Sequence, residues 1–317
     1  MSKEYDLTIQ GHPNIYNNNS PRSLKIFFSE PNSGVNEETG IVLLIPGFGG
    51  HSNSKVYKKM RSVFADKYNL VSIQCDYFGL EFMQNNPLPE SRSNFNDMGI
   101  MQALDNITVI GIVEQILKDN SLNFNAGKVI AYGHSHGAYL AYLMNVLSPD
   151  LLTLVIDNSA WLYPKYVDMS RELFRNNGEI YEFNYIAKNV VKDKQLLDLN
   201  YLYMYYNNNC KIHAFHGSED SLITLYDKKS FCEKNHNCFL HEVNENNIDL
   251  QVFKSLGHGL NADFLGLFDL CMKNKELKFQ SKENIGFKEV GIATNANLYS
   301  VTYSSNIPIL SVKSIKN

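Results

Sequence analysis

The stretch KVIAYGHSHGAYLAYLM, residues 128–144, passes from a strand-like apolar run to a helix-like apolar run at a single serine. Gly133 and Gly137 stand two positions before and after Ser135. A turn this sharp leaves no room for side chains at those two positions, and it lifts the serine hydroxyl above the sheet. The N-terminus of the helix would then point at an oxyanion formed beside that hydroxyl. The pattern predicts a strand–nucleophile–helix turn with Ser135 as the nucleophile.

An acid and a histidine follow the serine in the order that such a site requires. FHGSEDSLIT (215–224) places Asp220 after a predicted strand, and SLGHGLNAD (255–263) places His258 after the last one. A serine hydroxyl is a weak nucleophile, so a histidine must take its proton and an acid must orient that histidine. The pattern predicts a triad of Ser135, Asp220 and His258, with Asp157 as the alternative acid because it ends the preceding strand.

A glycine-rich loop supplies the backbone donors for the developing negative charge. IPGFGGHSN (45–53) follows a buried strand, and its glycines let backbone N–H groups turn into the site. We expect the N–H groups of Phe48 and His136 to form the oxyanion hole, with Gly49 replacing Phe48 if the loop is shifted by one residue.

The other histidines and the glycines indicate no metal or cofactor. The sequence has no H-E-x-x-H, its cysteines lack paired spacing, and the glycine loop matches neither a dinucleotide fingerprint nor a P-loop. His213 and His216 are interpreted as packing residues, His134 as a local structural or steering residue, and His51 as a neighbour of the oxyanion loop. We give His136 the same local role, apart from its backbone.

Strand-like and helix-like runs alternate along most of the chain. This alternation predicts a mostly parallel sheet with helices on both faces. We expect strands in 5–11 and 23–30, then 40–50, 70–79, a strand ending at 132, 151–160, 211–220 and 248–259, and helices at about 53–68, 99–119 and up to 274.

Two segments interrupt that alternation. Residues 161–209 are too long for one connecting helix, so they are interpreted as a lid or cap inserted into a core of residues 1–160 and 210–275. The tail, 276–317, carries strand-like runs that predict a hairpin added to a sheet edge.

Composition excludes several classes of protein. The 317 residues are 44% hydrophobic and 20% charged, and the net charge of −4 disfavours nucleic acid as a partner. We expect no signal peptide, because MSKEYDLTIQG lacks an apolar core, and no membrane span. The five scattered cysteines indicate reduced thiols and a cytoplasmic location. The sequence does not indicate an oligomeric state.

The motifs PGFGG (46–50), GHSHG (133–137), HGSED (216–220) and GHG (257–259) together resemble those of the α/β-hydrolase superfamily, over about residues 40–275. The resemblance implies the α/β-hydrolase fold, with an eight-stranded, mostly parallel sheet and a lid between the sixth and seventh strands, where 161–209 falls. The chain departs from the frequent His-Gly at the oxyanion loop, which here is Pro46-Gly47. The region AYGHSHGAYLAYL is also similar to bacterial hydrolase-like proteins of undefined function, some of them encoded beside surface-glycan genes.

Three functions fit these residues. The first is a serine hydrolase that cleaves an ester, thioester or amide; the second is an acyltransferase with the same triad; the third is a binding protein whose active site has lost its activity.

Aromatic residues are concentrated in the insertion and predict a helical lid over Ser135 whose tyrosines suit a short acyl group on a small polar molecule or glycan. They are Trp161, Tyr163, Tyr166, Phe174, Tyr181, Phe183, Tyr185, Tyr201, Tyr203, Tyr205 and Tyr206.

Overall fold

The main sheet is mixed but mostly parallel. The computed structural model describes residues 2–304 and 307–315. In that part of the chain, eight strands form one sheet in the order β1-β2-β4-β3-β5-β6-β9-β10. The first two pairings, β1 with β2 and β2 with β4, are antiparallel, and the others are parallel. The strands are β1 (Lys3–Gln10), β2 (Ser23–Glu30), β3 (Gly40–Ile45), β4 (Leu70–Cys75), β5 (Val129–His134), β6 (Leu154–Asn158), β9 (Lys211–Gly217) and β10 (Cys238–Val243).

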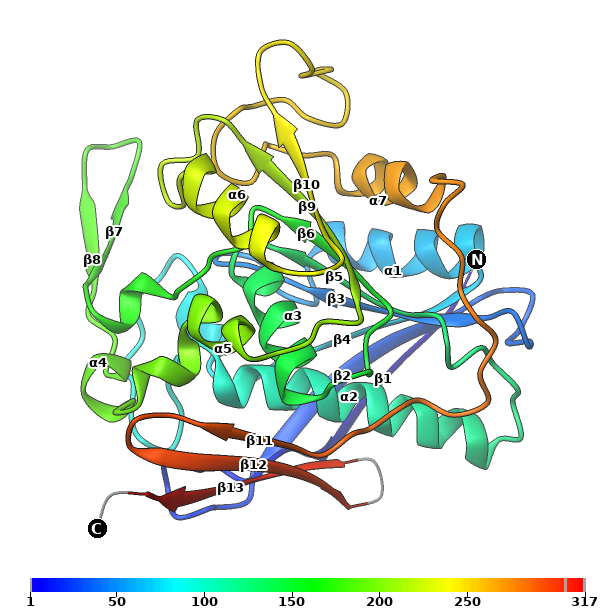
Figure 1. The fold of residues 1–317 in the computed structure, drawn as a ribbon, viewed down its shortest axis with the longest axis horizontal. Coiled ribbons are helices and arrows are strands. Elements are labelled where there is room, and N and C mark those ends of the chain that lie inside the picture. Colours follow the sequence, from blue (N-terminus) through cyan, green and yellow to red (C-terminus); the bar gives the residue numbers. More distant parts are fainter. Residues whose placement is uncertain (1, 305–306, 316–317) are drawn as a thin grey trace.

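Helices cover both faces of this sheet (Figure 1). The helices α1 (Lys55–Tyr68) and α7 (Phe264–Met272) lie on one face, and α2 (Ile100–Asp119), α3 (His136–Leu147) and α6 (Leu225–Lys234) lie on the other. Successive side chains of β3 alternate between the two layers, because neighbouring residues of a strand point to opposite faces. Val42 and Leu44 join the layer of α1, whereas Leu43 and Ile45 join the layer of α2 and α3.

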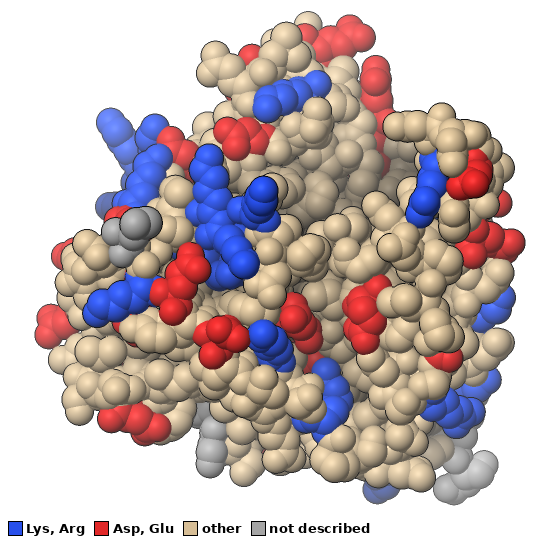
Figure 2. All heavy atoms as spheres, turned by 180° about the vertical axis from the view of Figure 1, so that it is seen from behind, with Lys and Arg blue, Asp and Glu red and all other residues tan. Residues whose placement is uncertain are grey.

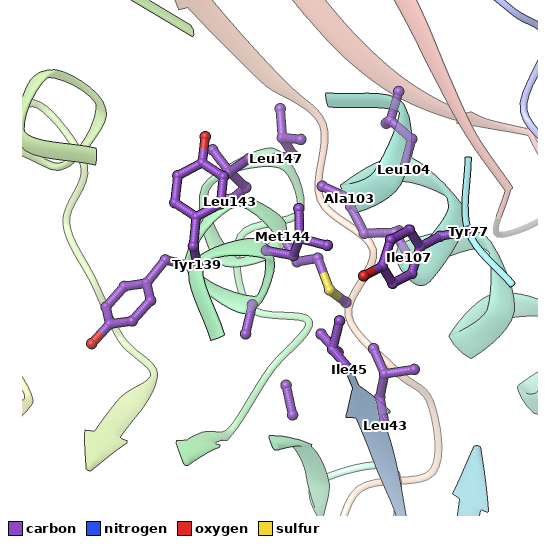
Figure 3. Close-up of a cluster of buried hydrophobic side chains, with 14 of the residues drawn as sticks. Leu43, Ile45, Tyr77, Ala103, Leu104, Ile107, Tyr139, Leu143, Met144 and Leu147 are labelled. Atoms are coloured by element: carbon purple, nitrogen blue, oxygen red, sulfur yellow. The ribbon is translucent and has the colours of Figure 1, made fainter. Parts of the chain in front are cut away.

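The larger core lies between β3, α2 and α3. Figure 3 shows Leu43 and Ile45 of β3 facing side chains such as Ile107 of α2 and Met144 of α3. By length and composition alone α2 is apolar enough to cross a membrane, although no stretch of that kind was expected from the sequence. Its most apolar window is 83% buried inside the protein. Packing in the core therefore accounts for the hydrophobicity of α2.

Surface charge is mixed on the face seen in Figure 2. Lysine and arginine side chains gather toward one side of that view, but aspartate and glutamate lie among them. This face therefore has no continuous basic surface of the kind that binds a phosphate backbone.

The insertion between β6 and β9 is a mixture of short elements. It contains η2 (Lys165–Val167), β7 (Arg171–Phe174), β8 (Ile180–Phe183), α4 (Ala187–Val190), η3 (Lys194–Leu197) and α5 (Leu199–Met204). A purely helical lid was the wrong prediction, because β7 and β8 form an antiparallel hairpin. Its turn contains Asn177 and Gly178, and Gly178 has a φ of 85° that favours glycine. This Asn-Gly pair is a sequence signal for the hairpin.

The tail forms a sheet of its own. Its strands β11 (Val290–Ala293), β12 (Asn297–Ser304) and β13 (Ile307–Ser314) are antiparallel, so it has one strand more than a hairpin and does not extend the main sheet. Figure 1 shows it beside α2. Val301 and Leu310 enter the larger core, and the Leu310 N–H donates to His12 Nε2 over 3.1 Å. Burying these residues against α2 explains why the tail leaves the sheet edge.

The last strand of the main sheet lies earlier than predicted. It is β10, at Cys238–Val243, whereas 248–259 is a loop. One oxygen of Asp249 accepts the N–H groups of Gln251, Val252 and Phe253, which bends the chain away from an extended strand. The helix α6, which joins β9 to β10, was also not predicted from the sequence.

The turn at Ser135 gives a direct test of the fold. A Cβ on Gly137 would overlap the carbonyl oxygen of Ile45, so we expect Gly137→Ala to lower the free energy of unfolding by about 1–3 kcal/mol or more. Alanine within a helix ordinarily stabilises it by about 1 kcal/mol relative to glycine. A decrease in the free energy of unfolding would therefore be opposite to the usual effect of this substitution. Urea unfolding measures the change.

The matched control is Gly291→Ala, because the nearest atom to a Cβ there lies at an ordinary 3.9 Å. We expect its stability to be unchanged or slightly raised. A Gly137→Ala protein as stable as the control would contradict the close approach of β3 to α3.

Candidate active site

Ser135 lies at a strained turn between β5 and α3. Its φ of 53° and ψ of −116° are unusual for a residue with a side chain, and such strain costs on the order of 1–3 kcal/mol. The Ser135 N–H donates to the carbonyl of Asn158 over 2.8 Å, which ties the turn to the end of β6. A Cβ on Gly47 would lie 2.6 Å from the His134 carbonyl oxygen and 3.2 Å from Ser135 Cβ, so the glycine loop runs directly against the turn.

The three residues predicted to form a triad are brought together. Ser135 Oγ lies 2.7 Å from His258 Nε2, and His258 Nδ1 lies 2.8 Å from Asp220 Oδ2. The other oxygen of Asp220 accepts the N–H groups of Leu222 at 2.8 Å and Ile223 at 3.2 Å. The side chains therefore form one continuous hydrogen-bonded chain from hydroxyl to carboxylate.

Asp220 is held in its ionised form. Burial alone would raise the pKa of its carboxyl, but the hydrogen bond and charge of His258 and the N–H of Leu222 outweigh burial, so the pKa lies below its ordinary value. The carboxylate is therefore charged at neutral pH and accepts the hydrogen bond of His258 Nδ1–H. That bond leaves Nε2 as the nitrogen that faces Ser135.

The end of β6 also positions His258. The Gly259 N–H donates to Ser159 Oγ over 3.0 Å, and Asn158 Nδ2 donates to the Gly259 carbonyl over 3.4 Å. Asn158 and Ser159 were not among the residues predicted from the sequence. Two polar residues directly after a buried strand are the signal that could have identified them, because the carboxyl ends of parallel strands carry such sites.

The alternative acid, Asp157, serves a different part of the structure. One of its oxygens lies 2.6 Å from Lys228 Nζ and accepts the Tyr142 hydroxyl at 2.8 Å, and the other accepts the Ala160 N–H at 2.6 Å. Both Asp157 and Lys228 are fully buried. Asp157 therefore neutralises a buried cation of α6, and Asp220 is the acid that reaches His258.

The glycine loop leaves one backbone donor available beside the serine. In the described part of the chain the Phe48 N–H has no hydrogen-bond partner, whereas the Gly49 N–H donates to the Met83 carbonyl over 2.9 Å. The Tyr77 hydroxyl anchors the start of the loop by donating to the Pro46 carbonyl over 2.8 Å. The His136 N–H belongs to the first turn of α3, where backbone donors have no partner within the helix. This pattern favours Phe48 over Gly49 as the second donor.

The histidines on either side of Ser135 are buried and neutral. Burial lowers the pKa of His136 to about 3, and burial together with the charge of His258 lowers the pKa of His134 to about 4. His136 Nε2 lies 2.6 Å from Gln102 Oε1, which fixes the imidazole in the core. The two rings therefore add no positive charge to the site at neutral pH.

The remaining histidines lie outside the hydrogen-bonded chain. His216 Nε2 donates to the Ile223 carbonyl over 2.9 Å and so supports the loop that carries Asp220. His213 Nδ1 lies 2.8 Å from His241 Nε2 on neighbouring strands. His51 lines a cleft of about 950 Å³ whose lining includes none of the three triad residues.

Aromatic side chains of the insertion surround Phe48. The ring of Phe48 stacks on Trp161 at 5.4 Å and meets the edges of Tyr166 at 5.5 Å and Tyr185 at 6.3 Å. Tyr203 instead packs in the core against Tyr142. The aromatic residues of the insertion thus form two groups. The rings around Phe48 lie against the glycine loop, whereas Tyr203 belongs to the core.

Comparison with known proteins defines the fold. Residues 81–236 match a family model described as a protein of unknown function (DUF2920), a range that contains Ser135 and Asp220 but not His258. None of the curated proteins matches the sequence. Among solved structures, the chain is similar to one described as a study of two fungal esterases from Rhizomucor miehei, with a TM-score of 0.54, 13% identity, and coverage of 86% of this chain and 82% of that one.

Two further structures are similar. The peroxisomal alpha-beta-hydrolase Lpx1 from Saccharomyces cerevisiae has a TM-score of 0.54, 13% identity, and coverage of 86% of this chain and 87% of its own. The chain has the α/β-hydrolase fold. Est1E from Butyrivibrio proteoclasticus agrees, with a TM-score of 0.50, 16% identity, and coverage of 79% and 92%. The predicted fold is confirmed. Because the sequence identities are this low, the similarity establishes the fold and no shared activity.

The buried pair of Asp157 and Lys228 makes a stability prediction. We expect Asp157→Asn to lower the free energy of unfolding by about 3–5 kcal/mol, because it leaves the Lys228 ammonium buried without its counter-charge. Asp220→Asn should cost less, since its partner His258 is a partly exposed imidazole and not a fully buried ammonium. Urea unfolding of both variants measures the difference.

The double variant Asp157→Asn with Lys228→Met removes both charges and should recover part of the loss. A stable Asp157→Asn protein, or an equal loss in Asp220→Asn, would contradict the structural role of Asp157.

Proposed function

We propose that this protein is a serine hydrolase that cleaves an ester, thioester or amide through an acyl-enzyme intermediate. The observation that carries the proposal is the continuous chain from Ser135 Oγ through His258 to the Asp220 carboxylate. The similar structures add support, since one is described as a study of fungal esterases and another as an alpha-beta-hydrolase.

Each residue has a defined part in the proposed reaction. Ser135 Oγ attacks the carbonyl carbon of the substrate while His258 Nε2 accepts the hydroxyl proton. The backbone N–H groups of Phe48 and His136 bind the negative oxygen of the tetrahedral intermediate. His258 then returns the proton to the leaving group, which departs and leaves the acyl group on Ser135. Water enters, gives a proton to His258 and releases the acid, and Ser135 regains its proton.

Asp220 supports this cycle through its charge and its position. A carboxylate with a lowered pKa stays ionised, so it stabilises the imidazolium that forms when His258 takes a proton. Because the pKa is lowered in the folded protein, the stabilisation from Asp220 is fully present above the pKa of the unfolded carboxyl. It is lost as the pH falls through the folded pKa.

The surroundings of Phe48 favour a short acyl group on a polar carrier. The rings of Trp161, Tyr166 and Tyr185 provide flat apolar surfaces, and the half-buried Tyr166 adds a polar hydroxyl. A long lipid chain would instead require an extended aliphatic groove. We therefore propose an esterase or deacetylase that acts on a small polar or glycan-linked substrate.

Two other functions use the same residues. An acyltransferase would pass the acyl group from Ser135 to an alcohol or a sugar, and product analysis with and without such an acceptor distinguishes it from a hydrolase. A binding protein that has lost catalytic activity is disfavoured, because hydrogen bonds of 2.7 and 2.8 Å still connect the three triad residues.

The nucleophile is tested by substitution and covalent labelling. We expect Ser135→Ala to lower kcat by several orders of magnitude and to abolish labelling by a fluorophosphonate, because no hydroxyl remains to attack. Asp220→Asn should lower kcat by roughly 10³-fold or more, because His258 loses the anion that fixes its tautomer. A chromogenic acetate ester and gel-based probe labelling provide the measurements.

A melting curve within a few degrees of the unaltered protein shows that Ser135→Ala is folded. Labelling of the folded alanine variant at the original rate would contradict the assignment of Ser135.

The acyl preference is tested with a series of esters of one alcohol. We expect kcat/KM to be highest for acetyl and to fall as the acyl chain grows from acetyl to decanoyl, because the rings around Phe48 leave room for a short group. Initial rates below and above the solubility limit of the longer esters complete the test. A steady rise toward long chains, with activation at a lipid interface, would indicate a lipase instead.

A further inference from the structure

The insertion holds a buried guanidinium that has no acidic partner. Arg171 begins β7, pairs with Phe183 at the base of the hairpin, and is 8% exposed. The ion pairs of the described residues do not include Arg171. Its Nη1 is buried without a hydrogen-bond partner among the described residues, its Nη2 donates to Asn85 Oδ1 over a long 3.4 Å, and the side chain also hydrogen-bonds with the Tyr185 hydroxyl. Part of the donor capacity of this guanidinium, at Nη1, is therefore unused.

Other buried cations of the chain are better satisfied. Arg22 forms a two-pronged ion pair with Asp105 at 2.6 and 2.7 Å, and Lys228 lies 2.6 Å from Asp157. Arg61, which has no acidic partner either, donates to the Ser52 carbonyl over 2.7 Å. A buried charge with neither a counter-charge nor full hydrogen bonding is costly. The exception at Arg171 indicates a site that is completed by a ligand.

Arg171 lies beside the ring that borders the proposed oxyanion hole. Its guanidinium carbon lies 4.7 Å from the centre of the Phe48 ring and 5.0 Å from that of Phe183. Burial raises the pKa values of the Tyr166 and Tyr185 hydroxyls; the Arg171 charge offsets part of the rise at Tyr166, and a hydrogen bond with Arg171 together with its charge offsets part of it at Tyr185. The Tyr185 hydroxyl itself donates to the Phe82 carbonyl over 3.2 Å. The Arg171 cation therefore lies in the aromatic cluster around Phe48, against the glycine loop.

We propose that Arg171 binds a carboxylate on the carrier part of the substrate, so that the protein acts on short acyl esters of an anionic alcohol. This inference rests on the proposed hydrolase function and names its substrate class. A guanidinium matches a carboxylate with two parallel hydrogen bonds, and its single charge equals that of one carboxylate, whereas a phosphate monoester brings nearly two. Because acetyl, the acyl group proposed above, carries no charge, the negative charge belongs to the carrier.

The test compares an anionic ester with its neutral counterpart. The probes are 4-acetoxybenzoate, its methyl ester, and 4-acetoxyphenyl phosphate, all with an acetyl group on a phenolic oxygen. We expect kcat/KM of the unaltered protein to be about 10- to 100-fold higher for the carboxylate than for the methyl ester. Arg171→Met should remove that preference and leave the methyl ester within about threefold of its original value. Arg171→Lys should restore part of it, because a lysine keeps the charge without the planar fork.

Arg175→Met is the matched control on the same hairpin. The Arg175 guanidinium lies 4.0 Å over the Tyr181 ring and donates to the carbonyl of Asn85, so it is already engaged. We expect this variant to keep the carboxylate preference. If Arg171→Met does not fold, as judged by its melting curve, the comparison of Arg171→Lys with the unaltered protein replaces it.

A binding measurement separates this inference from the proposed reaction. Calorimetry of 4-hydroxybenzoate with Ser135→Ala should give a Kd that rises about 10-fold or more when Arg171→Met is added. Arg171-dependent binding without hydrolysis of any probe would contradict the hydrolase and retain the anion site. Hydrolysis with equal kcat/KM for the acid and its methyl ester, unaffected by Arg171→Met, would contradict the anion site and retain the hydrolase. A preference for the phosphate would overturn the assignment to a carboxylate.

Discussion

Direct contact between backbones at the Ser135 turn determines how the rest of the molecule is arranged. Gly47, Gly133 and Gly137 each lie where a Cβ would meet main-chain atoms of a neighbouring element. These contacts press the glycine loop after β3, the end of β5 and the start of α3 into one small volume. Because β3 and β5 are adjacent parallel strands, the same three glycines also fix where the two central strands end. The strained dihedral angles of Ser135 persist because the surrounding backbone leaves no relaxed alternative.

The end of β6 joins this turn to the other two triad elements. Three consecutive residues there have separate tasks: Asp157 neutralises Lys228 of α6, Asn158 accepts the Ser135 N–H, and Ser159 accepts the Gly259 N–H. The end of β6 therefore contacts three parts of the site: the helix α6 that follows Asp220, the turn at Ser135 and the loop that carries His258. This arrangement explains how a histidine on a long loop can lie 2.7 Å from a serine on a rigid turn.

The sequence was most informative where backbone geometry restricts residue type. Gly133, Ser135 and Gly137 predicted the turn and with it the fold, because few residues tolerate such a turn. The edge strand β10 was missed because its half-exposed residues lack a continuous apolar run, and its helix α6 was missed with it. Aromatic content suggested a helical insertion, although an Asn-Gly turn specifies a hairpin. Arg171 could not be singled out at all, since the absence of a partner for a buried charge is visible only in three dimensions.

The tail sheet has a consequence for the order in which the protein is completed during synthesis. The Tyr201 hydroxyl donates to the Ala293 carbonyl over 3.0 Å, and the Asn295 N–H donates to Gln195 over 2.8 Å, so the tail supports the second half of the insertion. The ribosome makes residues 290–315 after every strand of the main sheet. A nascent chain therefore has all its triad residues before the second half of the insertion gains this support. Until then, residues 193–201 lack these contacts and are more open to proteases and chaperones than in the finished protein.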